Sequence, residues 1–379
     1  MFQMNIKQKI PIGLKNIRYQ VYIMVTEIIL SVIVVEVLFR ITYYAINKKN
    51  YHVSLKLKWK DSYVVPHPFL SFSYKKNTTI NKNQKLPYPI HTNKFFSFKE
   101  PLNVNSLGHF GDEFSSKKDK VRILCLGAST TANNISDGKK DYTYPKLLEE
   151  YLNKKLGKKV EVFNCGIGGW TSVDIFINFV LNLIQLKPDY VILYHGYNDL
   201  PLYLMNDFEL DYQHGRKNLG EVIHKTKMAN MLPKIKFLHS YEFVKDKLFG
   251  TGNIRNDVLR LITKSKIDYT NKYKDFKTQR DIIEQLIILC YVNKIKPIVS
   301  TFCYYDHERN LESSRVKEGV EIENRDIKYI AKKLDCWFVD QDKLIDKKDE
   351  NFVDSIHFTP IGMKKLAQNF GDTILEIKE

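Results

Sequence analysis

The chain has 379 residues, of which 44% are hydrophobic, and a formal net charge of +16 at pH 7. This length fits one domain with appendages, and the hydrophobic content is sufficient for a large core. The positive charge favours an anionic partner such as membrane lipid, a phosphorylated polymer or nucleic acid. The sequence contains no helix-turn-helix, zinc-finger or RNA-binding motif, and Lys is abundant throughout together with Asn and Ile. We therefore expect no binding to nucleic acid.

The N-terminal region combines a basic tail, residues 1–20, with a mostly apolar stretch, residues 21–46. A membrane span needs about 20 such residues, so we predict a transmembrane anchor over 21–46. Three charges interrupt it, namely Glu27, Glu36 and Arg40. Glu36 and Arg40 are four residues apart, so they share a helix face and can pair. An amphipathic helix, a buried helix and an uncleaved signal-like segment are the alternatives, and no small-residue cleavage site follows the stretch.

The orientation of this anchor follows from the charges that flank it. Basic residues precede the span, which favours an N-terminus inside the cell. Lys48 and Lys49 follow the span and weaken this asymmetry. We expect the N-terminus inside and the rest of the chain outside the cytoplasm.

Residues 47–120 are polar and aromatic, and prolines recur along them. They are predicted to form an extended linker that ends in a glycine-containing stretch, Asn105 to Glu113, and packs on the domain that follows. A part in shaping a substrate cleft is a hypothesis for this segment.

The remainder, residues 121–379, alternates predicted strands and helices. Strands are expected near 121–126, 160–163, 190–194, 297–302 and 336–340, and helices near 143–156, 172–186, 279–294, 315–334 and 360–377. This alternation is typical of a parallel sheet with right-handed crossovers. We therefore predict an α/β fold, a flavodoxin-like three-layer sandwich with a five-stranded parallel sheet.

A basic insertion at about 200–278 interrupts this alternation. Residues 221–280 carry 14 Lys or Arg and 6 Asp or Glu, a net charge of +8. A long insertion beside a site often forms a lid or a substrate wall. A solvated pair of helices with a basic face is an equally good interpretation.

The five cysteines, Cys125, Cys165, Cys290, Cys303 and Cys336, are odd in number and show no tight pairing. Their pattern does not indicate a disulfide framework. Buried free thiols are expected, and no metal-ligand spacing or cofactor motif stands out.

Residues suited to acyl transfer follow the predicted strands. Ser129 follows the first strand, and Asp354 precedes His357 by three residues in the loop before the last helix. Serine is a weak nucleophile that needs an adjacent base, and the base needs an orienting acid. Because the carboxyl ends of parallel strands gather at one sheet edge, Ser129 is placed where such folds bind ligands.

Two further segments offer donors for a developing oxyanion. Asn164 to Gly169 is a glycine-rich turn after the second strand, and Gly196 and Asn198 follow the third strand. Losing one oxyanion donor typically costs about 10²–10³ in turnover.

Taken together, these blocks resemble those of the SGNH (GDSL-like) hydrolases, membrane-anchored bacterial type. The resemblance covers roughly residues 100–379 and rests on Gly127-Ala-Ser129, Asn164 to Gly169, Gly196-Tyr-Asn-Asp199 and Asp354-Ser-Ile-His357, in that order. It implies Ser129 as nucleophile, His357 as base and Asp354 as orienter of the imidazole. It also implies the Ser129 and Gly169 N–H groups and the Asn198 amide as oxyanion donors. Ala128 replaces the usual aspartate before the serine, a residue outside the triad.

Other interpretations of the same residues remain. Each block taken alone is as readily a turn or a helix cap. An α/β-hydrolase is disfavoured because Thr131 stands where its Gly-x-Ser-x-Gly elbow has the second glycine. We expect a serine esterase acting on O-acyl groups, with O-acetyl groups of a cell-surface glycan as its substrate. An O-acyltransferase, a lipase, lysophospholipase or thioesterase, and a non-catalytic binding module are the alternatives.

Overall fold

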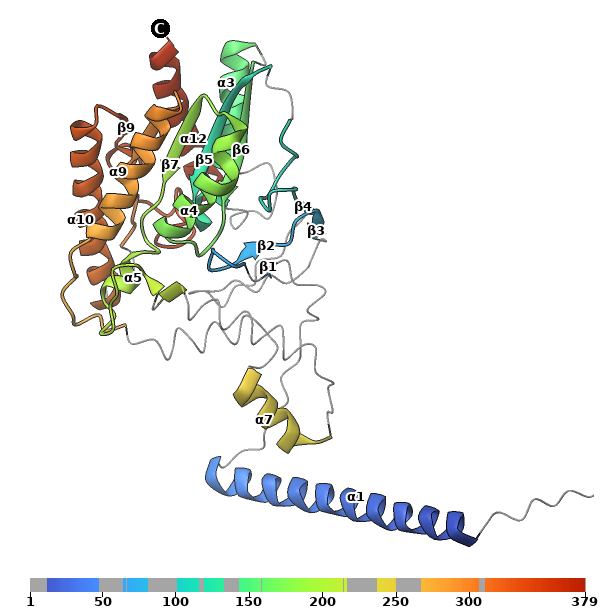
Figure 1. Cartoon of the computed structure of the whole chain (residues 1–379). Coiled ribbons are helices and arrows are strands. Elements are labelled where there is room, and N and C mark those ends of the chain that lie inside the picture. Colours follow the sequence, from blue (N-terminus) through green and yellow to red (C-terminus); the bar gives the residue numbers. More distant parts are fainter. Residues whose placement is uncertain are drawn as a thin grey trace, which may run out of the picture. The chain divides into compact units, whose positions relative to one another are not determined.

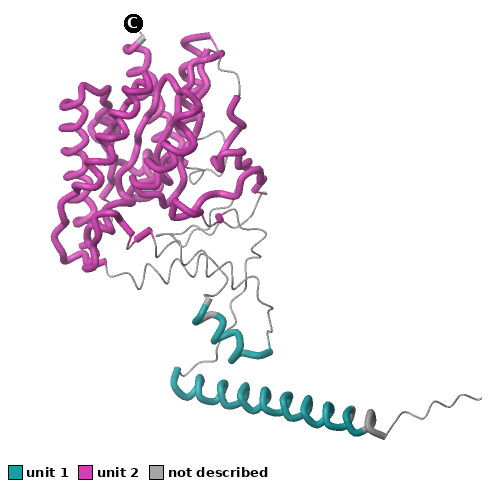
Figure 2. Tube along the Cα trace, in the orientation of Figure 1, with its two compact units in different colours: residues 1–57, 225–253 teal, residues 58–224, 254–379 magenta. Residues whose placement is uncertain are grey.

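The computed structural model describes residues 12–47, 64–65, 67–80, 101–115, 119–132, 143–157, 159–213, 215–216, 237–249, 267–306 and 311–378. Most of the basic tail, much of the 47–120 linker and a large part of the basic insertion lie outside these residues. The chain forms two compact units, residues 1–57 with 225–253, and residues 58–224 with 254–379 (Figure 2).

The larger unit is built on a five-stranded sheet among the described residues, with the strand order β6-β5-β7-β8-β9. The strands are β5 (Val121–Gly127), β6 (Val160–Gly166), β7 (Tyr190–Tyr194), β8 (Lys296–Ser300) and β9 (Trp337–Val339). All four pairings are parallel. Near-continuous burial of β5 and β7 explains why both read as apolar runs. The predicted α/β fold with a flavodoxin-like order is confirmed.

Helices pack on both faces of this sheet (Figure 1). Helices α3 (Tyr144–Leu156) and α12 (Pro360–Lys378) lie against each other on one face. The other face is covered by α4 (Ser172–Asn178), α9 (Lys277–Val292) and α10 (Leu311–Lys333). The helix expected over 172–186 changes character along its length, because α4 continues into a π-helix, Phe179–Leu183, and a 3-10 turn, Ile184–Leu186.

Three short helices of the described residues follow strands of the sheet at its carboxyl edge. Helix α2 (Ser129–Ala132) follows β5 directly, and α5 (Leu200–Tyr203) follows β7 after a short loop. Helix α11 (Gln341–Leu344) follows β9.

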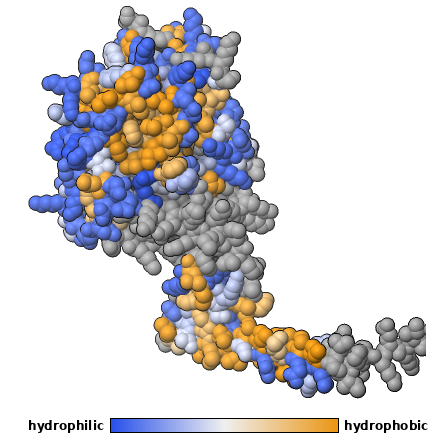
Figure 3. Space-filling view, viewed as in Figure 1, coloured by the Kyte–Doolittle hydropathy of each residue, from blue (hydrophilic) through white to orange (hydrophobic). Residues whose placement is uncertain are grey.

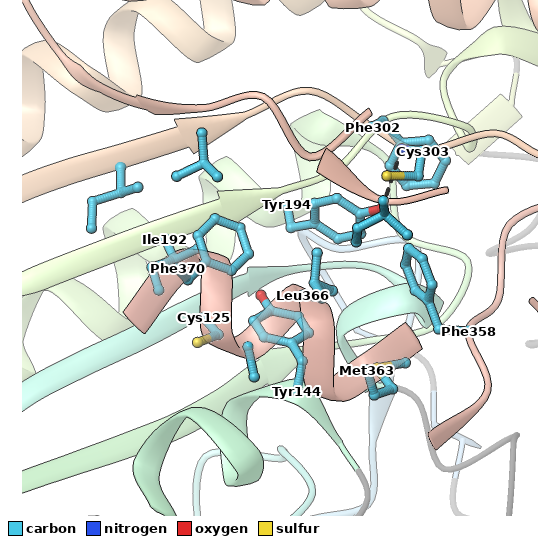
Figure 4. Packing of buried hydrophobic residues seen from close by; sticks show 14 of the residues in the cluster. Cys125, Tyr144, Ile192, Tyr194, Phe302, Cys303, Phe358, Met363, Leu366 and Phe370 are labelled. Carbon is cyan, nitrogen blue, oxygen red and sulfur yellow. Dashed lines mark hydrogen bonds between the residues drawn. The ribbon is translucent and has the colours of Figure 1, made fainter. Parts of the chain in front are cut away.

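The face under α12 holds an aromatic core. Tyr194 of β7 stacks on Phe302 with ring centroids 5.2 Å apart, and its hydroxyl accepts a hydrogen bond from the Cys303 N–H at 3.2 Å (Figure 4). Tyr144 and Phe370 pack beside it. All five cysteines are free, and all but Cys336 are buried.

Part of the predicted linker packs on this unit as two small hairpin-like pairs. Strand β1 (Val64–Val65) pairs antiparallel with β2 (Ser73–Tyr74), and β3 (Thr78–Ile80) pairs with β4 (Leu102–Val104). Their buried side chains, among them Phe72 and Tyr74, join the core on the α4 face. The linker is therefore part of the folded unit where it is described.

The smaller unit contains α1 (Ile12–Asn47) and α7 (His239–Phe249). Within α1, residues Tyr19–Asn47 are long and apolar enough to cross a membrane, and only 6% of the most apolar window is buried. A core helix would be mostly buried, so this helix is a candidate membrane span and the signal-sequence alternative remains open.

Candidate active site

The carboxyl edge of the sheet brings Ser129, His357 and Asp354 into contact. Ser129 opens α2 immediately after β5, and the other two residues lie in the loop before α12. His357 Nε2 lies 3.0 Å from Ser129 Oγ, and His357 Nδ1 lies 2.8 Å from Asp354 Oδ2. Ser129 and His357 are 228 residues apart in the sequence. The parallel sheet, and α12 which follows His357, bring them together.

The Asp354 carboxylate is held in its charged form. Oδ1 accepts the backbone N–H groups of Ile356 and His357 at 2.9 and 2.8 Å. Burial alone would raise the pKa of Asp354, but the neighbouring His357 and these hydrogen bonds outweigh it and lower the pKa to about 2. The carboxylate therefore stays ionised at neutral pH and can orient the imidazole through its second oxygen.

Of the other candidate oxyanion residues, Asn198 lines the same pocket as Ser129, whereas Gly169 is not among the residues that line it. A small pocket contains Ser129, Gly196 and Asn198, and Phe302 and Ile356 form its apolar wall. The Asn198 side-chain amide donates one hydrogen bond to the Trp170 carbonyl at 2.9 Å. An amide NH₂ carries two hydrogens, so this bond fixes its orientation and leaves a second donor.

The glycine-rich turn adopts a conformation that requires glycine. Gly169 has a φ of +84°, which side-chain-bearing residues rarely adopt. The turn is held from behind by the packed linker: the Gly168 N–H donates to the Tyr74 hydroxyl at 3.1 Å, and Trp170 Nε1 donates to the Phe72 carbonyl at 3.0 Å. The described part of the linker therefore contacts the segment that carries Gly169.

A buried carboxylate cluster lies beneath the Gly196–Asn198 loop, and sequence reasoning did not single it out. Asp199 is fully buried and accepts hydrogen bonds from the Ser172 N–H at 3.1 Å and from the Ser172 hydroxyl. His195 Nε2 lies 2.5 Å from Asp199 Oδ2. The Asn-Asp pair after β7 marks Asp199 in the sequence, but the sequence does not indicate that His195 and Ser172 would be its hydrogen-bond partners.

Glu323 of α10 is the second buried acid of this cluster. Its Oε1 accepts the Gln279 amide at 2.8 Å, and its Oε2 has no hydrogen-bond partner among the described residues. Burial, together with the nearby charge of Asp199, raises the pKa of Glu323 well above its usual range. Burial and the charge of Asp199 therefore favour the protonated form of the carboxyl group that lies under Gly196.

Comparisons with known proteins show the family of the chain. The family model described as "GDSL-like Lipase/Acylhydrolase family" matches residues 125–365, which is more than half of the chain and spans the positions from Ser129 to His357.

The chain belongs to the GDSL-like lipase/acylhydrolase family.

The family resemblance expected from the four sequence blocks is thereby confirmed, and with it the class of activity, hydrolysis of ester bonds. No curated protein matches. Similar solved structures include a GDSL-like lipase from Bacteroides thetaiotaomicron, at 16% identity and a TM-score of 0.40, covering 70% of this chain and 92% of that one. A catalytic mutant of an acetylxylan esterase from Geobacillus stearothermophilus matches at 16% identity and a TM-score of 0.42, covering 69% and 96%.

Proposed function

We propose that this GDSL-family chain is a membrane-anchored serine esterase that removes O-acetyl groups from a cell-surface glycan, with Ser129, His357 and Asp354 as its triad. The observation that carries the proposal is the position of His357, whose two ring nitrogens lie 3.0 Å from Ser129 Oγ and 2.8 Å from Asp354 Oδ2. This is the arrangement in which a histidine can take a serine proton while a carboxylate fixes its tautomer.

The proposed reaction has two halves. Ser129 Oγ attacks the ester carbonyl as its proton passes to His357 Nε2, and the collapse of the tetrahedral intermediate expels the alcohol, which takes that proton. Water then gives a proton to His357 and attacks the acyl-serine, and Ser129 recovers the proton as the acid leaves. Asp354 remains ionised throughout and stabilises the imidazolium formed in each half.

The negative charge on the carbonyl oxygen needs donors that are already in place. We assign this role to the backbone N–H groups of Ser129 and Gly169 and to the second N–H of the Asn198 amide. Support comes from the +84° φ of Gly169 and from the bond that fixes Asn198 to Trp170.

We take the small pocket at Ser129 as support for a short acyl group. Among the described residues, it holds about 170 Å³ of free space, part of which is open solvent. A larger pocket, about 760 Å³ by the same measure, is lined by residues such as Thr143 and Lys146 and does not include the triad. Because only the smaller of these two pockets contains Ser129, we place the acyl group there, with its methyl group against Phe302 and Ile356.

The assignment of a glycan rests on the expected orientation of α1. Basic residues before the apolar helix favour an N-terminus inside the cell, which puts the catalytic unit at the outer surface, where acylated envelope glycans are found. The basic charge of the chain suits an anionic glycan or a membrane surface equally well.

The test is hydrolysis of p-nitrophenyl acetate and of longer acyl esters by the full-length protein in detergent, compared with Ser129→Ala and His357→Ala. Turnover of the acetyl ester that both variants abolish is the expected result. A preference for long acyl chains would refute the acetyl assignment in favour of a lipase. A wild type that reacts with a fluorophosphonate at Ser129 but hydrolyses no ester would indicate an acyltransferase, and one that does neither would indicate a non-catalytic module.

A further inference from the structure

The membrane helix carries a buried acid whose partners come from the basic insertion. Glu36 is only 7% exposed although its neighbours along α1 are exposed. One carboxylate oxygen accepts Arg40 Nε at 2.7 Å and the His239 N–H at 2.8 Å. The other accepts the N–H and the hydroxyl of Ser240 at 2.9 and 2.8 Å.

These contacts make Glu36 a cap for another helix. The first N–H groups of a helix have no partner within the helix, and a negative charge at this end is favourable. His239 and Ser240 open α7, and Glu36 satisfies both of their N–H groups. Arg40 adds a bond from Nη2 to the Phe237 carbonyl at 2.6 Å, immediately before the helix. The start of α7 is therefore fixed to α1 through the side chains of Glu36 and Arg40.

Aromatic packing extends this contact along α1. Phe243 lies 5.2 Å from Phe39 and 5.7 Å from Tyr43 by ring centroids. Phe243 thus adds an aromatic contact to α1 beyond the hydrogen bonds of Glu36.

Exposed apolar side chains at α7 and in the turn before it form an apolar stripe. Phe237, Val244 and Leu248 are 72%, 53% and 59% exposed. Val244 and Leu248 are four residues apart and share one face of α7, and Phe237 lies in the turn that precedes the helix. Hydrophobic residues also cover much of the visible surface of α1 in the same compact unit (Figure 3). The stripe therefore resembles the exposed apolar surface of α1, which is the candidate membrane span.

The depth of Glu36 fits an interfacial position for α7. Tyr22 and Tyr43 are about 32 Å apart along α1 at 1.5 Å per residue, close to the roughly 30 Å thickness of a hydrocarbon core. Tyrosines favour the two interfaces, so Glu36 would lie about 10 Å inside the boundary marked by Tyr43. Helices that lie in the interface bury their apolar face by about 5–10 Å, which is the depth at which Glu36 holds the first turn of α7.

We propose that α7 is a second membrane-contacting element: docked on Glu36 of α1, it inserts Phe237, Val244 and Leu248 into the lipid leaflet that surrounds the C-terminal third of α1. The partner is the phospholipid bilayer. Glu36 serves as an acceptor that makes this docking possible and at the same time has its own charge compensated. Part of the insertion after the Gly196–Asn198 block is, on this view, a membrane anchor of the chain.

The experiment uses full-length protein in vesicles of phosphatidylcholine and phosphatidylglycerol. Cysteines introduced at Val244 and Leu248, in a Cys336→Ser background, carry an environment-sensitive NBD label. Tyr329→Cys, on an exposed helix position of the catalytic unit, is the matched control. Labels at 244 and 248 are expected to be quenched severalfold more by doxyl-labelled lipid than by aqueous iodide. The label at 329 is expected to be quenched more by iodide than by doxyl-labelled lipid.

Labels at 244 and 248 that iodide quenches as strongly as at 329 would overturn the proposal, because α7 would then face water. Labels shielded from both quenchers would overturn it as well, because protein would then cover the stripe. Glu36→Ala is expected to abolish the lipid quenching at 244 and 248, whereas Ile33→Ala, an exposed position of α1, is expected to preserve it. Unchanged quenching in Glu36→Ala would refute the docking role of Glu36. None of these readouts depends on ester turnover, so they stand apart from the test of the triad.

Discussion

Replacing Asp354 by asparagine tests the triad with the least change in shape. The Oδ1 atom of Asp354 accepts two backbone N–H groups of its own turn, and Oδ2 faces His357 Nδ1. Asparagine can keep its carbonyl on the turn, but its NH₂ group then points at the imidazole. An imidazole that accepts this bond at Nδ1 carries its proton on Nε2 and cannot take the proton of Ser129.

The size of the effect follows from the charge that is removed. A carboxylate and an imidazolium about 4 Å apart interact by roughly 4 kcal/mol at an effective dielectric constant near 20. This corresponds to about 10³ in rate. We therefore expect kcat/KM for p-nitrophenyl acetate to fall by about 10³ in Asp354→Asn.

The matched control is Asp349→Asn. Asp349 lies near the same loop in the sequence, is exposed, and accepts a hydrogen bond from the Tyr305 hydroxyl at 2.9 Å. Its replacement is expected to leave kcat/KM within about twofold, since surface substitutions rarely have large effects. A fall of less than about tenfold in Asp354→Asn, in a protein that melts as a single folded species, would contradict the assignment of Asp354 as the orienting acid.

The same substitution has a signature in stability. The pKa of Asp354 is lowered in the folded state, from an ordinary value of 3.8 to about 2, so the folded state binds fewer protons between these values. The stabilisation is present above about pH 4 and is lost as the pH falls towards 2, and it amounts to about 2 kcal/mol. Urea unfolding across this range should show a steeper loss for the wild type than for Asp354→Asn.

Three further substitutions test the support of the site. Gly196→Ala should lower kcat and cost about 1–3 kcal/mol of stability, because its Cβ would lie 2.7 Å from the Phe302 ring. Tyr74→Phe removes the acceptor of the buried Gly168 N–H, so we expect a loss of about 1–3 kcal/mol in urea unfolding and a lower kcat with little change in KM. Glu323→Gln should raise the melting temperature at pH 8 more than at pH 4, because the raised pKa of Glu323 makes its stabilising effect strongest at low pH and weakest as the pH rises.

Each of these outcomes can fail separately. A Gly196→Ala protein with wild-type kcat would show that the loop has room to move away from Phe302. Unchanged stability and kcat in Tyr74→Phe would mean that water replaces the tyrosine hydroxyl. A change in the melting temperature of Glu323→Gln that is no more favourable at pH 8 than at pH 4 would show that the pKa of Glu323 is not raised in the folded protein.

The sequence predicted the sheet closely, because buried parallel strands leave a simple pattern. The apolar runs at 121–126 and 190–194 correspond to β5 and β7, and burial on both faces explains why these runs are continuous. The helices were expected within a few residues of their observed bounds, since their apolar positions repeat at the helical period. The change into a π-helix at Phe179–Leu183 was not predicted. The spacing of apolar residues does not distinguish hydrogen bonding to the fourth preceding carbonyl from hydrogen bonding to the fifth.

The order of the four blocks was also a property of the sequence. Residues that follow parallel strands meet at one edge, so Ser129 and His357 could be paired before their distance was known. By contrast, the supports of the site depend on contacts between distant segments: Tyr74 with Gly168, Ser71 with Asp174, and Glu323 beneath Gly196. The residues next to Tyr74 or Glu323 in the sequence do not indicate which distant segment each side chain will contact.

The membrane end of the chain shows the same division. By itself the sequence determined that residues 21–46 form an apolar helix in which Glu36 and Arg40 share a face, because both features depend only on composition and helical spacing. Only the tertiary structure decided that Glu36 receives the first turn of α7, which begins 203 residues later in the chain. The physical reason is that a buried carboxylate needs hydrogen-bond donors. The sequence around Glu36 does not specify which of many distant N–H groups will supply them.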